Sequence, residues 1–165
     1  MGEFDMATKT KKQEDPSLIV RETTEELLKQ LGILEGNTIE CRYLPDQDLH
    51  QILIQSTQPA LLIGYHGETL SSLQLILGQH LRSRLQGWVN LSLNVNDYRE
   101  RRETSLTALA DSAVAQVLST GQPHSLPPLP ANERRIIHMY LADHPQVVTS
   151  SEGQGRSRCV IISPK

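Results

Sequence analysis

Two glycines, Gly64 and Gly67, separate two stretches of helical character near the middle of this 165-residue chain. The residues before them, 59–63, are apolar and predict a short helix or turn. The residues after them, 68–85, predict an amphipathic helix, because leucines and an isoleucine recur at helical spacing. Glycine adopts positive φ at little cost, so a helix–turn–helix element is expected here. Any fold of this chain must fit this element between its strands.

Three other stretches have the alternation or the apolar content that is typical of strands. They are residues 37–44, 49–55 and 89–95. The turn at 45–48 makes the first two strands antiparallel. A helix is expected over 18–31, with Ser17 as its cap. The order of elements up to residue 96 is then α-β-β-α-α-β.

The chain beyond residue 96 predicts two helices and a hairpin. Asp97 is placed to cap the first helix, with Glu100 as the reciprocal partner in a capping box. Gly121 is placed to end that helix. The expected elements that follow are a proline-rich extended segment, a helix, and the two strands of a hairpin, over residues 121–130, 131–143, 146–151 and 156–162.

Composition excludes several classes of protein. The net charge is −3, and no uncharged apolar run is long enough to span a membrane. Residues 1–17 are polar, so they predict a disordered tail and no secretory signal, and their first five residues resemble an expression scar. A cytoplasmic protein is therefore expected. Cys41 and Cys159 lie far apart, which favours two small buried hydrophobic residues over metal ligands.

Basic charge is unevenly distributed along the chain. Residues 1–96 hold eight Lys and Arg against twelve Asp and Glu, whereas residues 97–165 hold eight against seven. From Arg82 onward the clustered cations are all arginines, whose planar guanidinium suits phosphate. They are Arg82, Arg84, Arg99, Arg101, Arg102, Arg134, Arg135, Arg156 and Arg158. Any one cluster is equally typical of a solvated helix face.

The glycine loop, Gly64–Gly67, has two interpretations. By itself it is an ordinary turn between helices. Between two preceding strands and one following strand, it would let a nucleic-acid backbone approach closely. Amide groups at the start of the second helix would then face a phosphate, with help from the helix dipole.

In this context, residues 18–96 resemble a type II KH domain. The resemblance implies that the loop grips single-stranded RNA while bases lie in the groove beside the helices and sheet edge. The implied contact residues are Ile63, Gly64, Tyr65, His66, Gly67 and Thr69. The two central positions are often Lys or Arg in such domains. Here Tyr65 is suited to stacking and His66 to donating a hydrogen bond.

A second candidate site lies on the helix expected over 131–143. Arg134 and His138 are one helical turn apart and share a face. A fork of N–H donors beside an imidazole suits phosphate or ribose. Arg135 and Arg158 are expected nearby. The alternative interpretation is a hydrogen bond on a helix surface.

Residues 99–163 resemble the R-three-H domain family, which is named for this Arg and His and is associated with single-stranded nucleic acid. The order of the two domains is similar to that of the Jag family, the SpoIIIJ-associated proteins of bacteria. The expected fold class is α+β, with a tail over 1–17, a KH-type domain over 18–97 and a small α/β domain over 98–163. No counterpart of the extra N-terminal domain of many Jag proteins is expected.

An enzyme and a protein-interaction adaptor are the main alternatives. The sequence has no nucleophile elbow and no Walker sequence, and no cofactor or metal site is expected. An adaptor is favoured by the acidic first half and the non-basic loop. DNA is a third candidate ligand. The expected function is non-enzymatic binding of single-stranded RNA in post-transcriptional regulation, and a homodimer or pairing with another KH protein is left open.

Overall fold

The computed structural model describes residues 16–33 and 35–165, whose contacts form two compact units. The first unit contains the described residues up to Gln58 together with Ser71–Leu93. The second unit contains Pro59–Leu70 and Asn94–Lys165. By its contacts, the glycine loop is therefore grouped with the C-terminal half of the chain. The predicted domain boundary between residues 97 and 98 stays a prediction.

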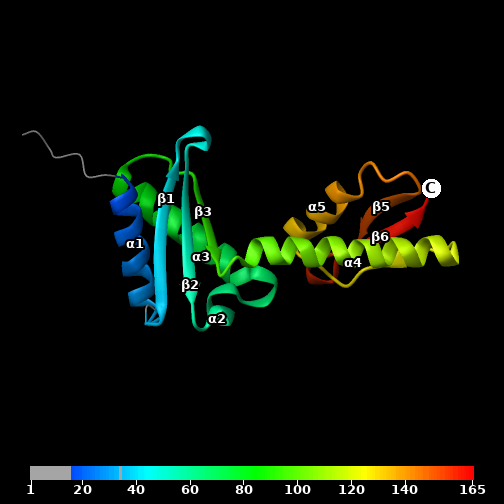
Figure 1. Cartoon of the computed structure of the whole chain (residues 1–165), viewed down its shortest axis with the longest axis horizontal. Helices are drawn as coiled ribbons and strands as arrows, with labels where there is room; N and C mark the ends of the chain where they lie inside the picture. Colours follow the sequence, from blue (N-terminus) through cyan, green and yellow to red (C-terminus); the bar gives the residue numbers. More distant parts are fainter. Residues whose placement is uncertain (1–15, 34) are drawn as a thin grey trace, which may run out of the picture. The chain divides into compact units, whose positions relative to one another are not determined.

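A three-stranded sheet in the order β1-β2-β3 forms the centre of the first unit (Figure 1). Its strands are β1 (Asn37–Leu44), β2 (Leu49–Ser56) and β3 (Leu91–Val95). β1 and β2 are antiparallel, as predicted, from Asn37 opposite Ser56 to Leu44 opposite Leu49. The helices are α1 (Pro16–Gln30), which contacts β1 and β2, and α3 (Glu68–Leu85). The order of elements is the predicted α-β-β-α-α-β.

Aliphatic side chains form the core of the first unit. Ile52 and Ile54 of β2 are buried, because alternate strand residues point to the same face. On α3 the leucines at four-residue spacing are buried: Leu73, Leu77 and Leu81. Sequence periodicity predicts Leu31, Tyr43 and Ile76 on the apolar faces of their elements, but each is instead exposed by about half.

Two helices and a second sheet form most of the second unit (Figure 1). Helix α4 (Tyr98–Thr120) contacts α5 (Ala131–Tyr140), and both contact β6. The strand order is β4-β6-β5, with antiparallel pairs. These strands are β4 (His124–Ser125), β5 (Val147–Glu152) and β6 (Cys159–Pro164). The unit also contains α2 (Pro59–Ile63), followed by a 3-10 turn over Tyr65–Gly67.

The core of the second unit is a cluster of aliphatic side chains from both helices and the sheet. Its buried members are Leu106, Ala110, Ala113, Val114, Val117, Leu126, Leu129, Ile137, Leu141, Val147, Val160 and Ile162. The small residues Ala110 and Ala113 allow other elements to approach α4 closely. Sequence periodicity predicts an apolar face on α4 from Leu106 to Leu118. Its residues are buried, apart from the half-buried Leu109 and the exposed Leu118.

The start of α4 differs from the predicted capping box. Asp97 has left-handed backbone, φ 54°, and its side chain makes no capping hydrogen bond. Asn94 supplies the cap, because its Oδ1 accepts the N–H of Arg99 at 3.2 Å. Its Nδ2 donates to Glu100 Oε2 at 2.7 Å. The predicted Asp97–Glu100 pair is therefore wrong, since the left-handed turn leaves the helix end open to the buried amide of Asn94.

Several predicted ends are also corrected. Helix α1 begins at Pro16, so Ser17 lies inside it and neither residue belongs to a disordered tail. The rest of the predicted tail, residues 1–15, lies outside the described residues. The second hairpin strand begins at Cys159 and not at 156, because Gly155–Ser157 form a 3-10 turn.

The two cysteines, which were predicted to be small buried hydrophobic residues, are free and half-buried. Burial raises the pKa of Cys41 to about 11. Across residues 16–33 and 35–165, no helix is both long and apolar enough to cross a membrane. Over the same ranges, no three His, Cys, Asp or Glu side chains come together as a metal site would require.

Replacing Ile137 with alanine should lower the free energy of unfolding by about 2–5 kcal/mol, because this side chain is fully buried in the second core. Met139 lies two residues further along α5 and is 66% exposed. Met139→Ala should therefore change the free energy by less than about 0.5 kcal/mol. Urea unfolding of both variants measures the difference, and equal losses would contradict the assigned face of α5.

Candidate nucleic-acid interface

Both glycines of the loop are required by its backbone. Gly64 has φ +69°, and a Cβ placed there would lie 2.7 Å from Thr69 Cβ. Gly67 has φ +79°, and its Cβ would lie 3.1 Å from Tyr98 Cε1. Any larger residue would be strained twice, by its φ and by its neighbour. The loop is therefore a built turn whose close packing leaves no room for a side chain at either glycine.

The two residues between the glycines face different surroundings. Tyr65 is 73% exposed, and the edge of its ring packs against His66 at 4.2 Å between centroids. His66 has left-handed backbone, φ 49°, and only 19% of its side chain is exposed. Ile63 and Thr69, on either side of the loop, are half-buried. Tyr65 is thus the loop side chain best placed to meet a ligand.

A buried carboxylate ties this loop to both long helices of the second unit. Arg102 of α4 donates to Glu133 of α5 through two nitrogens, at 2.7 Å to Oε1 and 2.8 Å to Oε2. His66 Nδ1 lies 3.1 Å from Glu133 Oε2 and also contacts the Arg102 guanidinium. Only 3% of the Glu133 side chain is exposed. Both carboxylate oxygens are therefore satisfied by partners, as a buried charge requires.

The electrostatics of this cluster follow from the same contacts. The hydrogen bond to Glu133 raises the pKa of Arg102 further above its ordinary value. Burial raises the pKa of Tyr98, whose ring packs on Gly67. Arg102 is thus a fixed cation behind the loop, with its charge largely matched by Glu133.

Arg134 and His138, the pair predicted on α5, both form hydrogen bonds with Ser151 of the neighbouring strand β5. His138 Nε2 lies 2.7 Å from Ser151 Oγ, and Arg134 Nη1 donates to the same oxygen at 3.2 Å. Arg134 Nε donates to the Leu129 carbonyl at 3.1 Å. The other imidazole nitrogen, His138 Nδ1, lies 2.7 Å from Thr149 Oγ1. Thr149 and Ser151 alternate along β5, so both face the helix.

These partners favour neutral His138. Burial lowers the pKa of this imidazole, and the positive charges of Arg134 and Arg158 lower it further. Because Ser151 accepts from Arg134, its own hydroxyl proton is available to His138 Nε2. His138 Nδ1 then carries the ring proton and donates to Thr149.

The other two arginines predicted at this site lie on the surface. Arg135 and Arg158 are exposed, and Arg158 Nη2 donates to the Ser151 carbonyl at 3.5 Å. Arg158 therefore contacts Ser151, the same residue of β5 that Arg134 and His138 contact. Positive charge gathers around Ser151, so this cluster of Arg134, His138, Ser151 and Arg158 is suited to an anionic group.

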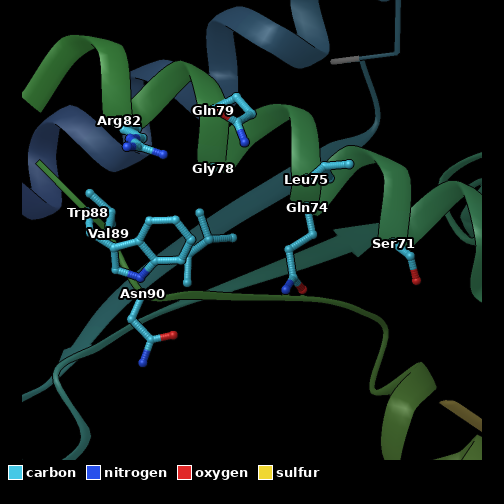
Figure 2. Close-up of a pocket in the computed structure, with 10 residues that line it drawn as sticks. Ser71, Gln74, Leu75, Gly78, Gln79, Arg82, Trp88, Val89 and Asn90 are labelled. Carbon is cyan, nitrogen blue, oxygen red and sulfur yellow. The ribbon is translucent and has the colours of Figure 1, made fainter. Parts of the chain in front are cut away.

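A groove of about 370 Å³ lies in the first unit, between α3 and the segment that leads into β3 (Figure 2). Arg82 and Gln74 extend from α3 toward the side formed by Trp88 and Asn90. The lining is mixed, with amides and a guanidinium beside apolar side chains. It consists of Ser71, Gln74, Leu75, Gly78, Gln79, Arg82, Trp88, Val89, Asn90 and Leu91.

The family comparison bears on the cluster around Ser151. Residues 104–164 match the R-three-H domain. This range includes most of α4, all of α5 and the second sheet, so the matched domain holds Arg134, His138, Ser151 and Arg158. The R-three-H part of the predicted resemblance is confirmed, while the type II KH part stays a prediction.

Curated relatives are similar over more of the chain. The RNA-binding protein KhpB of Lactiplantibacillus plantarum is 40% identical over 108 residues, which are 66% of this chain and 34% of the relative. KhpB of Streptococcus pneumoniae is 32% identical over 132 residues, 79% of this chain and 40% of the relative. KhpB of Bacillus subtilis is 36% identical over 115 residues, which are 68% of this chain and 55% of the relative. KhpB proteins belong to the Jag family. This chain spans between a third and three fifths of the lengths of these relatives.

The predicted site residues fall into two groups. Six lie in or beside the glycine loop, and Arg134, His138 and Arg158 meet at Ser151. Arg135 is exposed on α5 and is not one of the residues that meet at Ser151. The sequence reasoning missed Ser151 and Thr149, although their alternation on a predicted strand could have suggested them. It also missed the contact of Arg102 with Glu133, for which the sequence carries no signal.

Replacing Glu133 with glutamine should lower the free energy of unfolding by about 2–3 kcal/mol, because the guanidinium of Arg102 loses its buried counter-charge. Partial exposure of Arg102 keeps the loss below that of a fully buried pair. The matched control is Glu103→Gln at an exposed position of α4, which should change little. Urea unfolding compares them, and equal stabilities would show that the carboxylate is dispensable.

The lowered pKa of His138 predicts a pH dependence of stability. Between the ordinary imidazole value of 6.5 and the lower folded value, only the unfolded chain binds the proton. The contribution of His138 to stability is therefore complete above pH 6.5 and decreases as the pH falls through this window. Wild type should lose more stability than His138→Gln between pH 7.5 and 5, roughly the range in which an imidazole titrates. Parallel unfolding curves against pH would contradict this assignment.

Proposed function

We propose that this chain binds single-stranded RNA and does so without catalysis. The R-three-H cluster around Ser151 would hold one part of the strand, and the glycine loop of a type II KH domain would hold another. Post-transcriptional regulation, a cytoplasmic location and pairing with a second KH protein stay predictions. The observation that carries the proposal is the convergence of Arg134, His138 and Arg158 on Ser151 within a matched R-three-H domain.

The chemistry of the R-three-H cluster supports an anionic ligand. Arg134 and His138 are anchored to the protein, so they need little ordering when a ligand binds. Arg158 is exposed and adjoins the same strand, so it can reach a phosphate outside the cluster. Burial is the main cause of the lowered pKa of His138, and a phosphate at this place would offset the second cause, the charges of Arg134 and Arg158.

The glycine loop supports a second contact with the backbone of the strand. Its glycines allow the positive φ angles of the turn between α2 and α3, and Tyr65 is exposed for stacking on a base or sugar. His66 is turned toward Glu133, so its role is to hold the loop and not to donate freely to RNA. Two weak sites on one chain reinforce each other, because the second contact becomes intramolecular.

The relatives support RNA over other ligands, since proteins with this sequence similarity are named RNA-binding protein KhpB. The element order α-β-β-α-α-β with a glycine turn between its second and third helices agrees with a type II KH domain. A non-enzymatic role agrees with the contacts of His138, whose nitrogens both face hydroxyl groups of β5 that complete a structural network.

Anisotropy titration of a labelled single-stranded RNA tests the proposal. Arg158→Ala should weaken binding several-fold and lower the slope of log affinity against log salt by about one, because it removes one phosphate contact. Tyr65→Ala should weaken binding with little change in that slope. Both side chains are exposed, so neither variant should unfold.

The matched control is Arg42→Ala, which removes an exposed arginine from β1 that pairs with Glu40. It should leave affinity and salt slope within error of the wild type. If Arg158→Ala and Tyr65→Ala both bind as the wild type does, the two proposed sites are not RNA contacts. Binding of equal strength to an RNA duplex would also argue against a single-stranded ligand.

A further inference from the structure

Trp88 is the only tryptophan in the sequence, and 80% of it is exposed. The guanidinium carbon of Arg82 lies 5.7 Å from the centroid of its ring, so a cation already covers part of the indole. Figure 2 shows this pair at one end of the groove beside α3. A large aromatic surface left in water next to a groove suggests a ligand that stacks on it.

A glycine in the middle of α3 forms part of the same groove. Gly78 lowers helix stability relative to alanine, yet its backbone conformation does not require a glycine. A Cβ at this position would lie 3.5 Å from Leu91 Cδ2, an ordinary contact, so packing does not exclude alanine. Because Gly78 lacks the methyl group that alanine would have, it leaves additional space within the groove.

The polar groups around the groove are suited to a nucleobase. Gln79 and Asn90 present amides that can both donate and accept, as the edges of bases require. Arg82 supplies a positive charge, and none of the lining residues is acidic. Leu75 and Val89 add apolar surface for a ring. An anionic strand therefore meets no acidic side chain in the lining of this groove.

We propose that Trp88 and Arg82 form a stacking platform on which one unpaired base of the RNA lies, with Gly78 leaving the space for it. This inference rests on the proposed function and names a residue, Trp88, that determines which ligands bind. The platform requires a base with a free face, so it favours unpaired RNA over a duplex and over a polyanion without bases.

Fluorescence of the single tryptophan reports directly on the platform. A short mixed-sequence single-stranded RNA should quench Trp88 as it binds, whereas an abasic ribose-phosphate strand of equal length should bind without that quenching. Trp88→Ala should weaken RNA binding about tenfold, and Trp88→Phe should restore part of the loss. Binding of the abasic strand should be equal in all three proteins.

Gly78→Ala provides a test that does not depend on loss of folding. The variant should be more stable to heat than the wild type, since alanine favours the helix. It should nevertheless bind RNA several-fold more weakly, because the methyl group occupies the groove. Weaker binding from a more stable protein would support the proposal.

Three outcomes would overturn the platform. If RNA binds but Trp88 fluorescence and the Trp88→Ala affinity are unchanged, the groove is not a base site, while the R-three-H and loop contacts still stand. If fluorescence changes with protein concentration alone, a second copy of the chain covers Trp88. If neither RNA nor the abasic strand binds, the proposed function itself fails and the platform fails with it.

Discussion

The buried carboxylate of Glu133 is the interaction on which the second unit depends most. It accepts two hydrogen bonds from Arg102 and lies within hydrogen-bond distance of His66, so α4, α5 and the glycine loop meet at one charged group. A charge with 3% exposure is tolerated only when its partners are fixed. The position of the loop is therefore set by residues distant in the sequence, and not by the loop alone.

A second network joins α5 to β5 within the R-three-H domain. The hydroxyl oxygen of Ser151 accepts a hydrogen bond from Arg134 and lies within hydrogen-bond distance of His138 Nε2. The hydroxyl of Thr149 lies within hydrogen-bond distance of the other imidazole nitrogen, Nδ1. Residues that were expected to reach out to nucleic acid are first of all bonded to β5. These hydrogen bonds fix the Arg134 guanidinium beside His138, and Arg158 adds an exposed guanidinium next to the same strand. Burial lowers the pKa of His138, and the charges of Arg134 and Arg158 lower it further.

Local patterns predicted most of the elements. The strands β1 and β2, the helix α3 with its apolar face, and the hairpin of β5 and β6 apart from the start of β6 were predicted, since each depends on neighbours close in the sequence. The start of α4 was not. Two residues in left-handed backbone, Asn96 and Asp97, bring the buried Asn94 to the helix end, and propensity favours Asp97 in its place. The left-handed backbone of Asn96 and Asp97 therefore decides that Asn94, and not Asp97, caps α4.

The sequence by itself determined the α+β class, the glycine turn and the Arg134–His138 pair, because helical and strand periodicity, positive φ and four-residue spacing are local properties. Only the tertiary structure decided what those residues face. It turned His66 inward to Glu133, left Tyr65 and Trp88 exposed, and placed Ser151 between Arg134 and His138. Those outcomes depend on burial and on partners many residues away, which no local pattern encodes.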